Sequence, residues 1–242
     1  MTEQYYDVHC HVLPGVDDGS KDMDMSMAMI DMAYEQGVRT MIATPHYYPG
    51  HMRYPIEHLD KVYRETVSAI EAKYSDFKLY LGNEIHYRDE VVEKLKNKRI
   101  CTMAGTNYIL LEFSPGDKYE RLSNAVYKCL EAGYYPILAH IERYGCLWRN
   151  DKQIKDLIRM GAYMQINAEN FEGGFFSTDK RVCLRMIQDG LVHFLGSDCH
   201  NLGNRKPNLG QAYDYLREKL SPELYNTLTV TNPQKLLENK YL

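Results

Sequence analysis

Short apolar runs alternate along the chain with longer stretches in which apolar residues recur every three or four positions. The short runs are typical of buried parallel strands, and the longer stretches are typical of amphipathic helices that cover them. Strands are predicted over residues 5–9, 39–43, 78–83, 108–112, 136–140, 162–166 and 192–197. Helices are predicted over residues 22–36, 57–74, 89–97, 119–132, 151–160, 178–189 and 209–219. This alternation predicts an α/β fold.

Two helices allow finer predictions. Near the C-terminus, Asn232 is expected to cap a helix whose first position is Pro233. The first helix has four apolar residues spaced for one buried face: Met23, Met27, Ile30 and Tyr34.

Seven strand–helix units predict a β/α barrel one unit short of the usual eight. An open doubly wound sheet is the alternative, because it has the same alternation of elements. Neither a linker nor a repeat interrupts the pattern, so residues 1–242 are predicted to form one domain.

Composition narrows the classes of partner. The net charge of −4 gives no reason to expect nucleic acid or an anionic membrane as a partner. No apolar stretch approaches the roughly 18 residues of a membrane span, and the N-terminus lacks the pattern of a signal peptide. The six cysteines are widely spaced without CxxC pairs, as in reduced thiols. We therefore expect a cytoplasmic protein that is not inserted in a membrane.

Histidines and carboxylates stand where the predicted strands end, which is where functional residues of parallel α/β folds gather. His9 and His11 close the first strand in the motif DVHCH. Side chains alternate along a strand, so these two point the same way and Cys10 points to the opposite side. Asp198 and His200 repeat this spacing in GSDCH. Each pair can hold one metal ion.

Four further strand ends each carry one residue that can bind metal, in chain order His46, Glu84, Glu112 and His140. A single histidine at a strand end is usually structural. It is the joint pattern that predicts a metal site. The sixth strand is the exception, because its end offers only Gln165 and Asn167.

Other polar residues are ambiguous. Asp17 and Asp18 precede Gly19, and this sequence is as compatible with an ordinary turn as with a ligand. Four further histidines are not predicted to bind metal: His51, His58, His86 and His193.

Six motifs, spread in consistent order over residues 5 to 205, resemble those of the PHP (polymerase and histidinol phosphatase) superfamily. They are HCHVLPGVDDGS, ATPHYYPG, GNEI, LLEF, AHIERY and GSDCHN. They are most similar to the manganese-dependent protein tyrosine phosphatases encoded with bacterial capsule and exopolysaccharide genes. The resemblance implies a distorted seven-stranded β/α barrel that holds three divalent ions.

The resemblance also assigns ligands. It implies a first ion on His9, His11, Glu84 and Asp198. It implies a second ion on Glu84, Glu112 and His140, with Glu84 shared, and a third on Asp18, His46 and His200. It implies that Arg143 and Arg205 bind phosphate. Oxygen and nitrogen ligands admit manganese, iron or zinc, and manganese is the metal that the resemblance implies.

The activity implied is hydrolysis of phosphotyrosine by a metal-activated hydroxide. His46 or His200 is expected to protonate the leaving oxygen. The substrate implied is a phosphotyrosine protein, the tail of a bacterial tyrosine kinase in capsule or exopolysaccharide synthesis. The tyrosines of the loop 46–55 are predicted to pack against the substrate's ring, and a tyrosine-rich surface loop is the alternative: Tyr47, Tyr48 and Tyr54.

Rival functions stay open. A small-molecule phosphatase, similar to histidinol phosphatase, would use the same site. A barrel that binds metal or a partner without turnover is a non-enzymatic alternative. Cys199 and Arg205 also fit the C-x5-R signature of cysteine-dependent phosphatases. Cys199 is predicted to face away from the strand ends, however, which favours the metal mechanism.

Overall fold

Parallel strands form the centre of the computed structural model, which describes residues 4–48, 56–172 and 178–242. They pair as a three-stranded sheet of order β1-β2-β4 and a six-stranded sheet of order β3-β5-β6-β7-β8-β9. The strands are β1 (Tyr5–Cys10), β2 (Val38–Ala43), β3 (His46–Tyr47), β4 (Lys78–Leu81), β5 (Glu84–His86), β6 (Tyr108–Glu112), β7 (Tyr135–Leu138), β8 (Tyr163–Asn167) and β9 (Phe194–Gly196). The predicted α/β class is confirmed.

The predicted strand 78–83 corresponds to β4, and β5 follows it after a break of two residues, as β3 follows β2. The breaks coincide with Pro45, which has no N–H to donate to a ladder, and with Gly82. Hydrogen bonds nevertheless continue across them, since the Gly82 N–H donates to Ala43 O at 2.8 Å and the Glu84 N–H donates to Thr44 O at 3.3 Å. The segments that carry the two breaks therefore stay paired with each other across the breaks.

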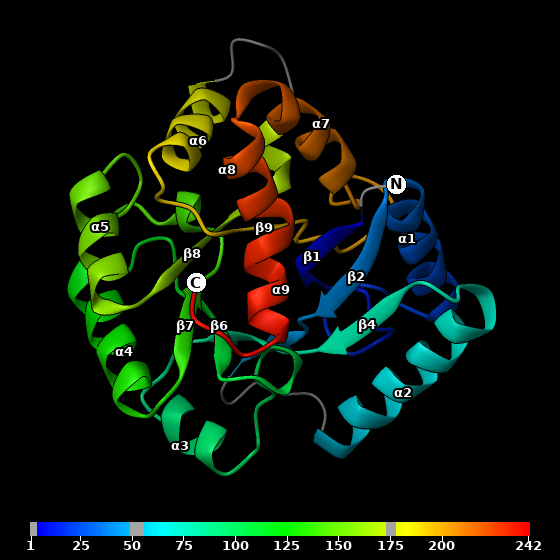
Figure 1. Ribbon diagram of the computed structural model, residues 1–242. Coiled ribbons are helices and arrows are strands. Elements are labelled where there is room, and N and C mark those ends of the chain that lie inside the picture. Colours follow the sequence, from blue (N-terminus) through cyan, green and yellow to red (C-terminus); the bar gives the residue numbers. More distant parts are fainter. Residues whose placement is uncertain (1–3, 49–55, 173–177) are drawn as a thin grey trace.

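The two sheets also meet where β1 and β9 end. The Asp198 N–H donates to His9 O at 2.8 Å, and the His11 N–H donates to Cys199 O at 2.9 Å. Residues from the two ends of the chain thus lie side by side. In Figure 1 the strands curl, and helices α1 to α7 lie around their outer side.

The helices are α1 (Met23–Glu35), α2 (Ile56–Lys73), α3 (Val91–Lys96), α4 (Tyr119–Glu131), α5 (Asp151–Met160), α6 (Thr178–Gln188), α7 (Leu209–Lys219), α8 (Pro222–Asn226) and α9 (Asn232–Leu237). Alternate strand residues such as Ile109 and Leu111 pack in the main core with the helices. The residues between them, such as Leu110, join a second buried cluster with Ile42, Ile137 and Phe194. The alternation of the strands therefore separates an outer core from an inner one.

The structure refines one helix prediction and contradicts another. The fully buried residues of α1 are Ser26, Met29, Ile30 and Ala33. Of the predicted face, Ile30 is buried, and Met27 and Tyr34 are partly buried against the main core. Methionines recur at nearly every second position of this helix, and this spacing does not distinguish neighbouring faces. Asn232 caps nothing, because residues 222–237 form one helical run that contains a π-helical turn, and its amide donates to His193 O at 2.9 Å.

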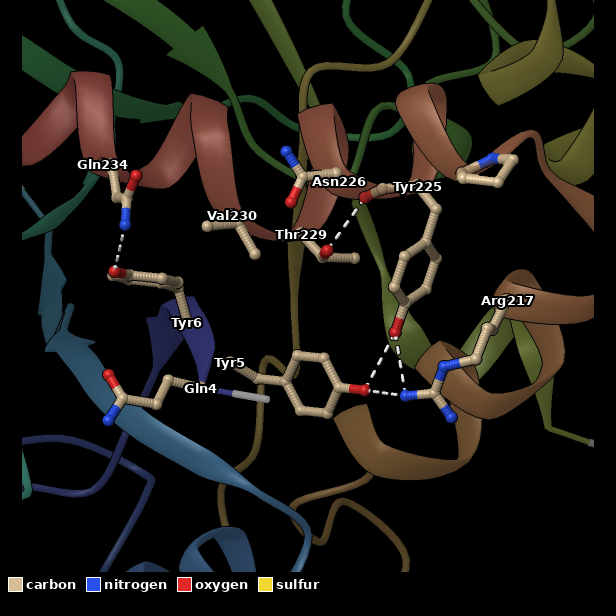
Figure 2. Close-up of a pocket in the computed structure, with 10 residues that line it drawn as sticks. Gln4, Tyr5, Tyr6, Arg217, Tyr225, Asn226, Thr229, Val230 and Gln234 are labelled. Atoms are coloured by element: carbon tan, nitrogen blue, oxygen red, sulfur yellow. Dashed lines mark hydrogen bonds between the residues drawn. The ribbon is translucent and has the colours of Figure 1, made fainter. Parts of the chain in front are cut away.

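This helical run lies beside the beginning of β1, at the end of the strand opposite His9. A pocket of about 430 Å³ lies between the run, β1 and α7 (Figure 2). Arg217 donates to the hydroxyls of Tyr5 and Tyr225, which are 2.9 Å apart. On the other side Gln234 donates to the Tyr6 hydroxyl at 3.0 Å. The polar groups drawn in Figure 2 thus tie α7, α8 and α9 to β1.

All six cysteines lie in the described residues and are free. Among the described residues, no helix has the length and apolarity needed to cross a membrane.

Candidate metal centre

The predicted ligands converge at the carboxyl ends of the strands. His9 and His11 do point the same way, with their Nε2 atoms 3.2 Å apart. Glu84 Oε2 lies 3.4 Å and 3.3 Å from these two nitrogens, and Asp198 Oδ1 lies 3.5 Å from each. These four residues form the first group that could hold an ion.

Glu84 also belongs to a second group. Its Oε2 lies 2.9 Å from His46 Nδ1, and its Oε1 lies 2.7 Å from His140 Nε2. Glu112 Oε1 lies 3.8 Å from the same His140 nitrogen. The atoms close enough to share an ion are those of His46, Glu84 and Glu112, whereas the resemblance implies His140 with the two carboxylates. With either choice of histidine, Glu84 belongs to both the first and the second ligand group.

A third group surrounds Asp18. Its Oδ1 lies 3.3 Å from His46 Nε2 and 3.5 Å from His200 Nε2. His11 completes this group, with its ring stacked on that of His200 at 3.8 Å between centroids. All nine residues predicted as ligands therefore lie within one connected cluster, here called the nine-residue cluster.

The nine-residue cluster suits cations. Three buried atoms that face the cluster are close to other ligand atoms but form no well-aligned hydrogen bond among the described residues: His46 Nδ1, Glu84 Oε2 and His200 Nε2. A buried polar atom without a partner costs about 1–3 kcal/mol. Divalent ions between these oxygen and nitrogen atoms would remove much of that cost, so the residues fit such ions.

The pKa shifts within the cluster also favour bound cations. Burial by itself would raise the pKa of Glu84, but the charge of His9 and the proximity of the other imidazoles hold it well below its usual range. Burial disfavours a charged His46, yet its ion pairs with Asp18 and Glu84 raise its pKa to about 10. Protons on imidazoles thus compensate the carboxylates when no cation does.

The backbone is strained at two of these positions. His140 has φ of 32° and Asp198 has φ of 52°, in the left-handed region that side chains with a Cβ rarely adopt. Such residues cost about 1–3 kcal/mol and concentrate at functional sites. Gly196 is needed beside them, because a Cβ there would lie 2.5 Å from the Cβ of His9.

Asp17, the less favoured of the two aspartates, has its own role in the geometry. Its Oδ2 lies 2.8 Å from His11 Nδ1, the nitrogen that faces away from Glu84. The same oxygen accepts the His46 N–H at 3.1 Å. Asp17 therefore orients His11 from behind, as carboxylates commonly do for metal-binding histidines.

The end of the sixth predicted strand, β8, is occupied by orienting amides. Gln165 Oε1 accepts the His140 N–H at 2.8 Å and lies 3.2 Å from His9 Nδ1. Asn167 Nδ2 donates to Asp198 Oδ2 at 2.8 Å. Both side chains were visible in the sequence at a strand end, which is the signal that could have identified them.

Of the histidines not predicted to bind metal, His86 borders the site. Its ring is buried, and its Nδ1 lies 3.3 Å from Glu112 Oε2. His58 is exposed on α2, and the ring of His193 accepts the Met164 N–H at 3.0 Å before β9. His51 lies outside the described residues.

The two predicted phosphate ligands lie at the entrance. Arg143 Nη2 is 3.0 Å from Asp198 Oδ2 and 2.9 Å from Glu169 Oε1. Arg205 Nη2 is 2.8 Å from Asp198 Oδ1. Their side chains are 35% and 30% exposed, so both guanidinium groups can be reached from solvent.

Cys199 does not face this site. It is fully buried in the main core, and burial raises the pKa of its thiol to about 12. A thiol nucleophile needs the opposite, an accessible group with a lowered pKa. The geometry argues against the cysteine-dependent alternative.

The three loop tyrosines differ. Tyr47 is buried, with Lys94 5.7 Å above its ring. Tyr48 is 36% exposed and stacks on His86. Tyr54 lies outside the described residues.

Comparison with known proteins agrees with this geometry. Residues 5–238 match the family model described as capsular polysaccharide synthesis, CpsB/CapC. The chain belongs to the CpsB/CapC family. The resemblance to capsule-associated phosphatases inferred from the six motifs is thereby confirmed.

Members of the CpsB/CapC family resemble the chain over almost its whole length. Tyrosine-protein phosphatase CpsB of Streptococcus agalactiae is 33% identical over 241 residues, covering 98% of this chain and 99% of that protein. Tyrosine-protein phosphatase YwqE of Bacillus subtilis is 33% identical, covering 97% and 92%.

One solved structure, from work on YwqE of Bacillus subtilis and CpsB of Streptococcus pneumoniae, superposes with a TM-score of 0.89 at 30% identity. It covers 97% of this chain and 95% of that one. Those proteins are described as metal-dependent tyrosine phosphatases.

Proposed function

We propose that this protein is a metal-dependent protein tyrosine phosphatase. The observation that carries the proposal is the convergence of histidines and carboxylates from separate strand ends around Glu84. The activity of the CpsB and YwqE relatives supports it.

We propose three divalent ions, manganese by family resemblance, held by the ligand sets stated above. When bound, the ions supply positive charge to the phosphate and lower the pKa of a coordinated water to about 7. Six positive charges would face the four carboxylates of Asp18, Glu84, Glu112 and Asp198. The surplus suits a phosphomonoester dianion.

The chain's own groups complete the site. Arg143 and Arg205 would bind the phosphate oxygens with their planar forks and stabilise charge that develops on them. Tyrosine has a pKa of about 10, so the leaving oxygen needs little help from an acid. His46 is 25% exposed and His200 is 2% exposed, and whichever of them protonates it would do so from the ring nitrogen that holds no ion.

Two structural predictions belong with this function. We propose that β2 with β3, and β4 with β5, each act as one strand, which would give a distorted seven-stranded barrel. We also propose that residues 1–242 fold as one domain, in keeping with a main core that draws residues from Tyr5 to Leu228.

The proposed substrate is a phosphotyrosine protein, namely the tail of a bacterial tyrosine kinase in capsule synthesis. The test is metal analysis of the purified protein, followed by turnover of a phosphotyrosine peptide, histidinol phosphate and single-stranded DNA with manganese. Selective turnover of the peptide, abolished by EDTA, is the expected result. Preference for histidinol phosphate would assign a small-molecule substrate to the same site, and activity that survives full chelation would refute the metal mechanism.

A further inference from the structure

Strand register places a second row of side chains next to the nine-residue cluster. In the pairing of β3 with β5, His46 lies opposite Glu84 and Tyr47 lies opposite Ile85. The next position in each strand brings Tyr48 towards His86, since both lie two residues further on. The rings of Tyr48 and His86 are indeed stacked, 4.2 Å apart at 14° between planes.

The pairing of β5 with β6 extends this row to Glu112. His86 and Glu112 are directly opposite in the register, and His86 Nδ1 lies 3.3 Å from Glu112 Oε2. Two residues along a strand advance about 6.6 Å. The row of Tyr48, His86 and Glu112 is therefore one layer closer to the entrance than the row of His46 and Glu84.

Burial differs sharply across this row. His86 is 3% exposed, so its ring is held between its neighbours, whereas Tyr48 is 36% exposed. Tyr47, on the other side of the strand, is 4% exposed and belongs to the main core. Of the two described loop tyrosines, Tyr48 is therefore the one exposed at the surface next to the site.

We infer that Tyr48 is a specificity residue that receives the aromatic ring of the substrate, and that His86 is the positioning residue beneath it. This inference rests on the proposed function. His86 stacks on the Tyr48 ring, and its Nδ1 lies 3.3 Å from Glu112 Oε2, so a shift of His86 would move both the Tyr48 ring and a proposed metal ligand. Aromatic rings prefer offset or tilted contacts with each other, and such a pair adds about 0.5–1.5 kcal/mol beyond burial.

The first test compares substrates that differ in the ring. Tyr48→Ala is expected to lower kcat/KM about two- to twelve-fold for phosphotyrosine peptide and p-nitrophenyl phosphate, mainly through KM, and to leave kcat/KM for phosphoserine peptide unchanged. Tyr48→Phe should restore the preference, because it keeps the ring. Tyr127→Ala, which removes a 59% exposed tyrosine of α4, is the matched control and should change neither substrate.

Binding without turnover gives an independent reading. Calorimetry on the manganese-loaded protein should show that benzylphosphonate binds more tightly than butylphosphonate, and that Tyr48→Ala removes the difference. His86→Ala should remove it too, and should also weaken metal binding, because Glu112 loses its partner. His86→Phe keeps a stacking ring but not the nitrogen, so it should retain ring preference while metal binding stays weak.

The outcomes separate the two proposals. If the wild-type protein turns over no phosphotyrosine, the proposed function fails, and the phosphonate comparison still judges the role of Tyr48. If turnover is normal but Tyr48→Ala affects aromatic and aliphatic ligands equally, this inference is refuted and the proposed function stands.

Discussion

Asp17→Asn perturbs the proposed metal centre without touching a predicted ligand. The carboxylate accepts from three groups: Oδ2 faces His11 Nδ1 at 2.8 Å and the His46 N–H at 3.1 Å, and Oδ1 accepts the Gly19 N–H at 2.9 Å. Asparagine has one acceptor and one donor in the same space. Its oxygen can still accept the Gly19 N–H, and its NH2 group then faces His11 Nδ1.

That exchange reverses the tautomer of His11. A donor opposite Nδ1 makes Nδ1 the acceptor and moves the ring proton to Nε2. Nε2 is the nitrogen that lies 3.3 Å from Glu84 Oε2 and 3.5 Å from Asp198 Oδ1, so a proton there occupies the position proposed for an ion. Loss of such an orienting partner typically weakens metal binding 10- to 100-fold, or about 1.4–2.7 kcal/mol.

The assay is calorimetric titration of the metal-free protein with Mn²⁺, together with the Mn²⁺ dependence of p-nitrophenyl phosphate turnover. Asp24→Asn is the control, because it removes an equal charge from an exposed position in the first turn of α1. Equal manganese affinity in the two variants would show that Asp17 does not orient His11, and the reasoning would be wrong.

Three further outcomes are expected. Cys199→Ala should keep most phosphatase activity while EDTA abolishes it, because the thiol is buried with a pKa of about 12; the reverse result in a phosphotyrosine assay would favour a cysteine mechanism. Gly196→Ala should destabilise the protein by about 1–3 kcal/mol in urea unfolding and weaken metal binding, since its Cβ would meet His9 at 2.5 Å. Gly116→Ala, with nothing within 4 Å, should do neither, and equal effects would remove the steric argument. Burial lowers the pKa of His193 from 6.5 to about 4 in the folded protein. As the pH falls, the unfolded chain therefore protonates His193 before the folded protein does. The free energy of unfolding should therefore drop by up to about 3 kcal/mol between pH 6.5 and 4, and His193→Asn, compared by urea unfolding across that range, should flatten the slope. An unchanged slope would contradict this.

The chain itself determined which residues stand at strand ends. The period-two alternation of DVHCH is local, so it settled that His9 and His11 share a side and that Cys10 does not. The alternation of strands and helices settled the α/β class, because a parallel strand needs a crossover before the next one can pair. The six motifs likewise identify the family, because they lie in the sequence itself.

Tertiary structure decided the distances and the supporting contacts. Whether Glu84 lies near Asp198 depends on strand order and curl, which join residues far apart in the chain and leave no local signal. The same holds for Asp17 behind His11 and for His86 beneath Tyr48, since each role arises from a neighbour on another segment. Periodicity shows on which side of a strand a residue lies, whereas packing alone selects the partner that it meets there.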